Sequence, residues 1–280
     1  MPETACPENV LITGLPRSGT TMTCWLINKL NDAVALHEPI RFSDYPDGRM
    51  ISSILVDFIR ETRAQLLREG TAPSHAMQGR IESNPISSIS ESDQQRRIIH
   101  RHQIVHFGQP MSNEFQLAIK HNAPFTALLD SLSSEYPIAM IIRNPLALLC
   151  SWQTVPLPIR DGRLPMGERY DPHLRDQLST LSEPLHRQIA ILDWCFEKYR
   201  NKPANHLFKY EDLIATGGRQ LASLFPAARD LNVELTSRNR NHLYPLHLCA
   251  SLASELLQRS HAWREFYTEA EILALANPSS

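Results

Sequence analysis

Residues 9–21 read NVLITGLPRSGTT, and this stretch decides the fold that we expect. The segment from Asn9 to Gly14 is almost entirely apolar, a pattern typical of a strand buried on both faces of a sheet. The turn LPRSG follows, and the residues from Thr20 to Leu30 can form a helix. Two glycines five positions apart allow several backbone N–H groups to face one anion, and a helix N-terminus adds partial positive charge. The stretch therefore predicts an anion site, rather than a glycine-rich turn that binds nothing.

The charges of this loop differ from those of the nucleotide P-loop, GxxxxGKS/T. Thr20 stands at the lysine position, and the positive charge comes from Arg17 inside the loop. The apolar run IAMII ends in Arg143, whereas a nucleotide kinase would need an aspartate near such a strand end to hold magnesium. The sequence therefore favours an anion of lower charge than a triphosphate, neutralised by side chains and without a metal ion.

The segments around this loop alternate between strands and helices. Such alternation predicts an α/β fold with a P-loop-like, doubly wound parallel sheet flanked by helices. Between Ile40 and Gln109 the pattern reduces to one helix and loops. We therefore expect a single domain of residues 1–280, with an insertion at about residues 40–110 and a C-terminal helical segment at about residues 230–280. The other predicted strands lie at residues 33–37, 115–120, 137–142 and 205–210, and the clearest helices at residues 51–69 and 183–200.

The composition argues against some classes of partner. A net charge of −2 gives no electrostatic reason to expect a nucleic acid or an anionic membrane. The five cysteines, at positions 6, 24, 150, 195 and 249, have no paired spacing, so we expect free thiols in a reducing compartment. The first ten residues lack a signal-peptide pattern, and no run is apolar enough to span a bilayer. We expect a cytoplasmic protein; the sequence does not indicate its oligomeric state.

Several motifs together resemble one enzyme family. GLPRSGTT, residues 14–21, resembles the 5′-phosphosulfate loop of sulfotransferases, in the arginine-bearing form similar to tyrosylprotein and bacterial sulfotransferases. IIRNPLALLCS, residues 141–151, resembles the 3′-phosphate motif of the family, and AIKHNAPFTALL and KYEDL resemble two further strand-end segments. Order and spacing agree over about residues 9–215. The C-terminal RKGxxGDW-type loop is not found, so contacts to the 3′-phosphate and adenine are unassigned there; Arg238 and Arg240 are substitutes, or simply solvated arginines.

The resemblance implies phosphoadenosine phosphosulfate (PAPS) as donor, PAP as product and no metal. Because PAPS carries a 5′-phosphosulfate and a 3′-phosphate, its binding requires two anion sites. Arg17 and Lys120 are candidates to stabilise the charge that grows on the bridging oxygen during in-line transfer. For Lys120, the structural alternative is a strand-end lysine that reaches solvent. For Arg143, it is a salt bridge at the sheet edge. The donor-binding candidates are Pro16, Arg17, Ser18, Gly19, Thr20, Thr21, Arg143 and Ser151.

The resemblance places a catalytic base at Glu38, directly after the predicted strand AVALH. A carboxylate at the end of a parallel strand faces the ligand crevice of such a sheet. His37 is the rival base, although strand geometry predicts that it points to the opposite face. A capping or ion-paired carboxylate is the structural alternative for Glu38.

These features predict a sulfotransferase that transfers a sulfuryl group from PAPS to a hydroxyl or amine of a small-molecule acceptor. The alternatives are a tyrosyl-peptide sulfotransferase, a non-catalytic PAP-binding module and a P-loop nucleotide kinase. The insertion, on the acceptor side, carries an acidic and aromatic patch that suits a cationic acceptor: Phe42, Asp44, Tyr45 and Asp47.

Two other patterns in the insertion are expected to be unrelated to the chemistry. His102 and His106 have the spacing of a metal motif, but a polar loop or helix face is favoured because glutamine replaces the general base. A short basic run, Arg96, Arg97 and Arg101, is expected at the solvated surface, and contact with the donor is the alternative.

Overall fold

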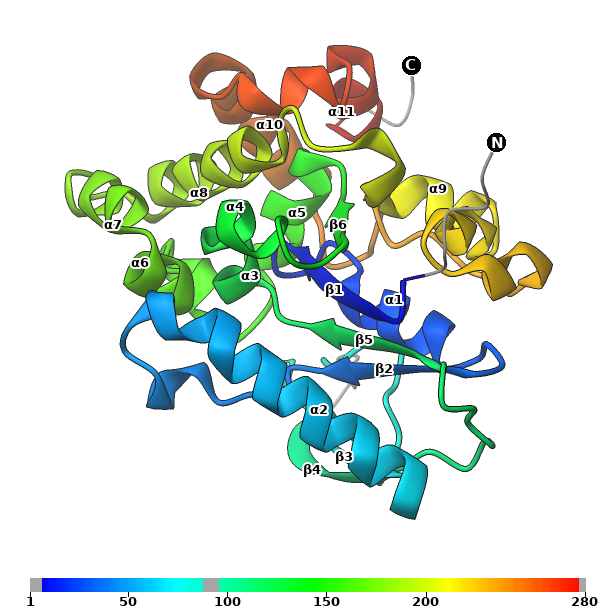
Figure 1. Ribbon diagram of the computed structural model, residues 1–280. Helices are drawn as coiled ribbons and strands as arrows, with labels where there is room; N and C mark the ends of the chain where they lie inside the picture. The colour runs from blue at the N-terminus through cyan, green and yellow to red at the C-terminus, as the bar shows by residue number, and fades with distance from the viewer. Residues whose placement is uncertain (1–6, 88–95, 277–280) are drawn as a thin grey trace.

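The computed structural model describes residues 7–87 and 96–276, so Cys6 and the N-terminal residues used for the leader prediction lie outside it. A five-stranded sheet of order β2-β5-β1-β6-β7 forms the centre, and all of its strand pairs are parallel (Figure 1). This confirms the predicted α/β fold with a doubly wound parallel sheet. The strands are β1 (Asn9–Gly14), β2 (Ala33–His37), β5 (Gln116–Lys120), β6 (Ile138–Ile142) and β7 (Leu207–Lys209).

Helices cover both faces of the sheet because successive strand residues point to opposite sides. In β1, Leu11 packs in one apolar core, whereas Val10 and Ile12 pack in a second core on the other face. The first core contains side chains of α2, α5, α8 and α10, and the second contains those of α1 and α9. The helices are α1 (Thr20–Ile27), α2 (Ile51–Glu69), α3 (Ala123–Ala127), α4 (Leu129–Leu132), α5 (Pro145–Trp152), α6 (Pro165–Tyr170), α7 (Pro172–Ser179), α8 (Pro184–Tyr199), α9 (Tyr210–Ala215), α10 (Leu246–Arg259) and α11 (Glu269–Ala276).

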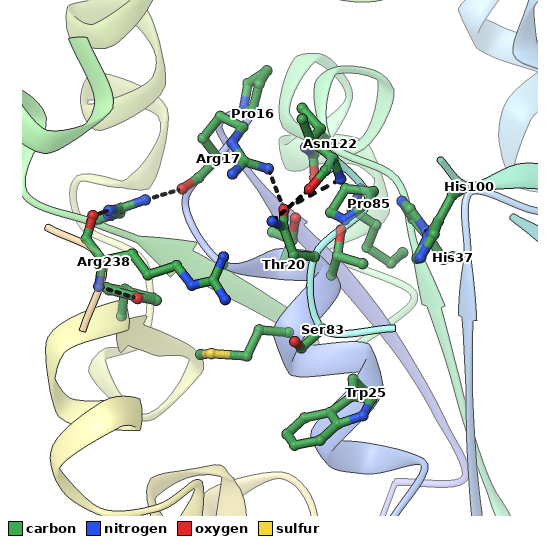
Figure 2. A pocket seen from close by; sticks show the side chains of 18 of the residues that line it. Pro16, Arg17, Thr20, Trp25, His37, Ser83, Pro85, His100, Asn122 and Arg238 are labelled. Atoms are coloured by element: carbon green, nitrogen blue, oxygen red, sulfur yellow. Dashed lines mark hydrogen bonds between the residues drawn. The ribbon is translucent and has the colours of Figure 1, made fainter. Parts of the chain in front are cut away.

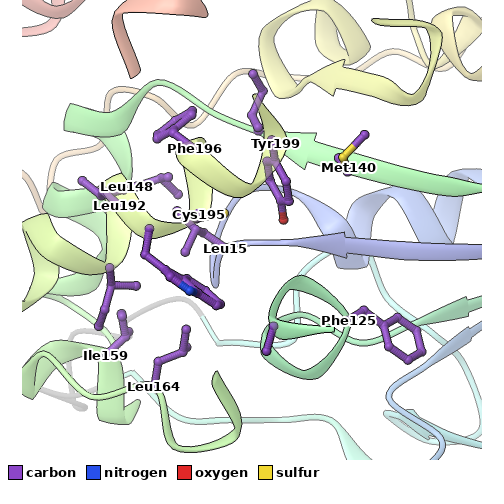
Figure 3. Packing of buried hydrophobic residues seen from close by; sticks show 14 of the residues in the cluster. Leu15, Phe125, Met140, Leu148, Ile159, Leu164, Leu192, Cys195, Phe196 and Tyr199 are labelled. Carbon is purple, nitrogen blue, oxygen red and sulfur yellow. The ribbon is translucent and has the colours of Figure 1, made fainter. Parts of the chain in front are cut away.

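The first core holds the loop after β1 in place. Figure 3 shows the buried face of α8, including Leu192 and Tyr199, beside Leu148 of α5 and Leu15 of the loop. The Tyr199 hydroxyl hydrogen-bonds with that of Thr126 at 2.8 Å, which bonds in turn with Thr13 of β1 at 2.7 Å. Each fully buried large apolar side chain stabilises the fold by roughly 1.5–3 kcal/mol, so the loop is attached to a rigidly packed core.

The boundaries of several elements agree with the sequence predictions. The strands at 9–14 and 33–37 and the helix at 51–69 have the predicted bounds, and the helix predicted at 183–200 is α8. The last strand is shorter than predicted because Tyr210 begins α9 directly after Lys209. Within the described ranges, no helix is both long enough and apolar enough to cross a lipid bilayer.

The insertion contains a hairpin that the sequence analysis missed. β3 (Thr71–Ala76) pairs antiparallel with β4 (Arg101–His106), which places His75 opposite His102. His102 and His106 therefore lie on a strand, not on the predicted loop or helix. The pattern was missed because β4 is polar and mostly exposed, so it lacks apolar alternation. The hairpin packs beside β2, where the His37 N–H donates to Ser74 Oγ at 2.9 Å (Figure 1).

The glycine that ends β1 tests how tightly the loop is packed. A Cβ at Gly14 would overlap the Ile141 carbonyl oxygen of β6 and would come within 2.6 Å of Ser18 Oγ. We expect Gly14→Ala to lower the free energy of unfolding by about 1–3 kcal/mol, the usual cost of overpacking, measured by urea denaturation. Gly108→Ala is the control because a Cβ there meets nothing within 4 Å. Equal effects of the two substitutions would contradict this account of the β1–β6 contact.

Candidate functional site

A cavity of about 500 Å³ opens at the carboxyl ends of the parallel strands, and all five strands contribute to it. The edge where parallel strands end is the usual ligand crevice of such sheets. Figure 2 shows Arg17, Thr20 and Asn122 around this space, with His100 beside His37 and Trp25 at the lower end. The strand-end residues in its wall are Pro16, Arg17, Gly19, Thr20 and Thr21 after β1, Glu38 after β2, Lys120 and Asn122 at β5, Arg143 after β6 and Tyr210 after β7.

The loop after β1 presents a helix N-terminus to the cavity. Gly19 precedes α1 at a φ of 104°, and no side chain caps the helix there. Because the first N–H groups of a helix have no intrahelical partner, they are free to bind an anion. The outer side of the loop is held by two donors: Trp152 Nε1 bonds the Pro16 carbonyl at 2.8 Å, and Arg143 Nη1 bonds the Arg17 carbonyl at 2.8 Å.

Four arginines line the cavity: Arg238 is exposed, whereas Arg17 is half-buried and Arg96 and Arg143 are buried. Arg17 donates to Ser151 Oγ at 3.3 Å and to Asn84 Oδ1 at 3.0 Å. In the part of the chain that the structure describes, the hydrogen bonds that Arg17, Arg96 and Arg143 donate are accepted by hydroxyl, amide or carbonyl oxygens. Burial, followed by repulsion from Arg96 and Arg143, lowers the pKa of Arg17 to about 9. The site therefore holds buried positive charge that an anion would neutralise.

Lys120 and Glu38 form an ion pair on the other side of β1. Lys120 Nζ is 2.5 Å from Glu38 Oε1, and the lysine side chain is only 2% exposed, whereas that of Glu38 is 38% exposed. Burial raises the pKa of Glu38, but attraction to Lys120, with smaller contributions from His37 and His121, outweighs this and holds that pKa far below its usual range. Glu38 is therefore an ionised carboxylate at the cavity wall. The structural alternative for Lys120, a strand-end lysine that reaches solvent, is wrong because its side chain is buried.

His37 lies in the same cavity wall as Glu38, which corrects the prediction that it points away. Its Nε2 is 3.9 Å from Glu38 Oε1, and its Nδ1 is 3.0 Å from His100 Nδ1. Successive side chains of a strand point to opposite faces, but this alternation ends at His37 because Glu38 has a φ of 48°, in the left-handed region. Burial, reinforced by Lys120, holds the pKa of His37 well below its usual value, so the imidazole is neutral.

Two of the predicted donor residues are behind the wall. Ser18 and Ser151 are both fully buried, and Ser151 reaches the cavity only through its bond to Arg17. Arg238 is exposed and lines the cavity, whereas Arg240 lines a separate, smaller pocket and donates to the Ala274 carbonyl.

The acidic and aromatic patch does not line this cavity, and the charge of the acceptor stays a prediction. Phe42 is buried against His121 and Phe125, and Asp47 pairs with Arg49 at the surface. The segment after Glu38 turns into the core because the Ile40 N–H donates to His121 Nε2.

The sequence analysis also missed several wall residues from the insertion and the C-terminal segment. Arg96, expected at the surface, is only 6% exposed, and His75, Asn84 and His100 come from the same insertion. Isolated polar residues outside a periodic element carry no signal that they will be buried. The other end of the cavity is more apolar, with Met22, Trp25, Ile214 and Leu235.

The comparisons with known proteins add little to this geometry. The chain matches no family model and no curated protein sequence. Among solved structures, it is similar to the sulfotransferase STF1 of Mycobacterium tuberculosis, with 16% identity and a TM-score of 0.33 over 98% of this chain and 77% of that one. It is also similar to the sulfotransferase domain of the Synechococcus olefin synthase, with 15% identity and a TM-score of 0.37 over 98% of this chain and 95% of that domain. Values this low carry no argument about the site.

The buried histidines predict an acid-sensitive fold. His121 accepts a hydrogen bond from the Ile40 N–H, and burial lowers its pKa to about 3, from 6.5. The unfolded chain therefore binds a proton below pH 6.5 that the folded chain excludes, so stability is present above pH 6.5 and is lost as the pH falls. We expect His121→Gln to reduce the slope of unfolding free energy between pH 4 and 6 by about 1.4 kcal/mol per pH unit.

Urea unfolding at several pH values measures this slope. His173→Gln, a substitution of an exposed histidine, is the control and should leave the slope unchanged. An unchanged slope in His121→Gln would mean that the folded protein protonates His121 as readily as the unfolded chain does.

Proposed function

We propose that the chain is a sulfotransferase that transfers a sulfuryl group from PAPS to a hydroxyl or amine of a small-molecule acceptor. One observation carries this proposal: a single cavity joins a cluster of arginines without carboxylate partners, among the described residues, to the Lys120–Glu38 ion pair. The arginines suit a donor with two anionic groups, and the ion pair suits a step that moves both negative charge and a proton. The predicted loop, Arg143, Lys120 and Glu38 all belong to this one cavity.

The proposed donor pose follows the chemistry of the wall. The N-terminus of α1, with Arg17, would bind the 5′-phosphosulfate. Arg143, which stacks on the Tyr210 ring at 4.6 Å, would bind the 3′-phosphate. The adenine would lie at the apolar end near Trp25, whose indole offers a flat surface to a base.

In this pose the sulfuryl group faces the ion pair. The acceptor oxygen or nitrogen attacks sulfur in line with the bridging oxygen, and the electron pair of the breaking S–O bond goes to the 5′-phosphate. Lys120 and Arg17 stabilise the charge on that oxygen, and one such contact is worth about 3 kcal/mol or more. Glu38 accepts the proton of the acceptor at its carboxylate, which Lys120 keeps ionised.

A non-catalytic PAP-binding module would need the two anion sites but not Glu38. The buried position of Lys120 against Glu38 favours catalysis, because an ammonium is costly to bury unless it is paired. No feature of the cavity favours a tyrosyl peptide over a small molecule. A kinase would require Mg-ATP to bind where the loop lacks its lysine.

Donor binding tests the proposal first. We expect PAP at 100 times its Kd to stabilise the folded protein by about 2.7 kcal/mol without magnesium, because the ligand binds only the folded state. Arg143→Ala should weaken PAP binding by about 10-fold or more, since a hydrogen bond to a charged group is lost. Arg240→Ala is the control because this arginine lies outside the cavity. Thermal unfolding and calorimetry measure both effects, and stronger stabilisation by Mg-ATP than by PAP would overturn the proposal.

Glu38→Gln tests the base. The substitution keeps the size and hydrogen-bonding shape of the side chain but removes its basicity. We expect kcat with PAPS and an acceptor to fall by roughly 100-fold or more while PAP affinity changes little. Because Lys120 holds the pKa of Glu38 far below its usual range, the wild-type rate should show no loss from Glu38 protonation between pH 5 and 8.

His37→Ala is the companion variant in this assay. A larger loss of kcat in His37→Ala than in Glu38→Gln would assign the base to the histidine. Near-wild-type rates in both variants would contradict a base from this part of the wall.

A further inference from the structure

Arg96 is a buried arginine that the insertion contributes to the cavity. Its side chain lies at the cavity wall, and the residue is 6% exposed. Its Nε donates to the Ser87 carbonyl at 3.1 Å, and its Nη1 donates to Thr154 Oγ1 at 3.2 Å. Two neutral partners from two segments hold this guanidinium, and no carboxylate of the described residues is bonded to it.

The partners of Arg96 join it to the second anion site. Thr154 N and Oγ1 both donate to the Ser151 carbonyl, at 3.1 and 2.9 Å. Ser151 Oγ accepts from Arg17 Nε at 3.3 Å, and the Arg17 carbonyl accepts from Arg143. Arg96 is therefore linked to Arg17 through Thr154 and Ser151, and Arg143 is linked to Arg17 by a direct hydrogen bond to its carbonyl.

The strand order separates this group from the ion pair. Glu38 and Lys120 end β2 and β5, on one side of β1, whereas Arg143 follows β6, on the other side. Thr154 follows α5, the helix that begins directly after Arg143. Through its bond to Thr154, Arg96 is held at the end of α5, whereas Glu38 and Lys120 lie at the strand ends on the other side of β1.

The charges on this side are unbalanced. After burial, repulsion from Arg96 does most to lower the pKa of Arg17. Burial, with a smaller contribution from Arg238, lowers the pKa of Arg96 itself. Among the described residues, these mutually repelling guanidiniums are held by hydroxyl, amide and backbone carbonyl oxygens. A phosphate monoester, with up to two negative charges, would turn this repulsion into attraction.

We propose that Arg96 binds the 3′-phosphate of the donor together with Arg143, so that the insertion supplies a buried cation beside the exposed Arg238 of the C-terminal segment. The inference rests on the proposed function. It assigns the insertion a part in donor selectivity, in addition to its place beside the acceptor. Of the two arginines that the sequence offered for this role, Arg238 lines the cavity with Arg96 and Arg240 does not.

Two nucleotides isolate the contact between Arg96 and the 3′-phosphate. PAP and adenosine 5′-monophosphate differ only by the 3′-phosphate, and calorimetry gives the Kd of each for the same full-length protein. We expect Arg96→Ala to weaken PAP binding by about 10- to 100-fold and to leave binding of adenosine 5′-monophosphate unchanged. Arg96→Lys, which keeps the charge but not the planar fork, should recover part of the affinity. Arg101→Ala, an exposed arginine of the same insertion, is the control and should match the wild type.

The outcomes separate this inference from the proposed function. If the wild-type protein binds PAP no more tightly than adenosine 5′-monophosphate, the PAPS-dependent function itself is wrong. If the wild type discriminates and Arg96→Ala discriminates equally well, or loses both nucleotides equally, the assignment of Arg96 is overturned. Should Arg96→Ala prove unfolded by thermal melting, Thr154→Val removes one support of the guanidinium and must itself lower the preference for PAP; an unchanged preference there overturns the assignment too.

Discussion

The cavity depends on the buried guanidinium of Arg143. It donates to the carbonyl of Arg17 in the loop, to the carbonyl of Arg238 and to the side chain of Asn239 in the C-terminal segment, and it stacks on the ring of Tyr210 after β7. One side chain at the end of β6 therefore holds three segments that are far apart in the sequence. Because arginine presents several donors in a rigid plane, no lysine could make this set of contacts.

The site stores unfavourable energy that the surrounding fold must offset. Arg17 and Glu38 both have a positive φ, at 74° and 48°, a conformation that costs a non-glycine residue of order 1–3 kcal/mol. The arginines repel one another. The buried ammonium of Lys120 is paired with one carboxylate, that of Glu38, which is itself partly exposed. Such costs concentrate at functional sites, where a rigid core keeps the groups in place for a ligand. The packing of α5 and α8 beneath the loop supplies that rigidity.

The insertion completes the cavity on both sides of β1. Its hairpin covers the β2 edge of the sheet and places His75 and His100 near Glu38, while Arg96 reaches the opposite side. The imidazoles of His37 and His100 stay neutral because burial disfavours their charged forms and Lys120 repels a second cation. The wall near Glu38 therefore combines one ionised carboxylate with neutral imidazoles.

The sequence by itself determined the parallel α/β sheet, the loop at residues 14–21 and the strand ends that carry Glu38, Lys120 and Arg143, because buried strands and glycine turns have local patterns. Only the tertiary structure decided that Arg96 and His100 join the wall, that His37 turns toward Glu38 and that the acidic patch turns away. These outcomes depend on contacts between segments distant in the chain, and an isolated polar residue has no periodicity that records its distant partners. Local pattern determines the elements; packing between them determines which side chains meet.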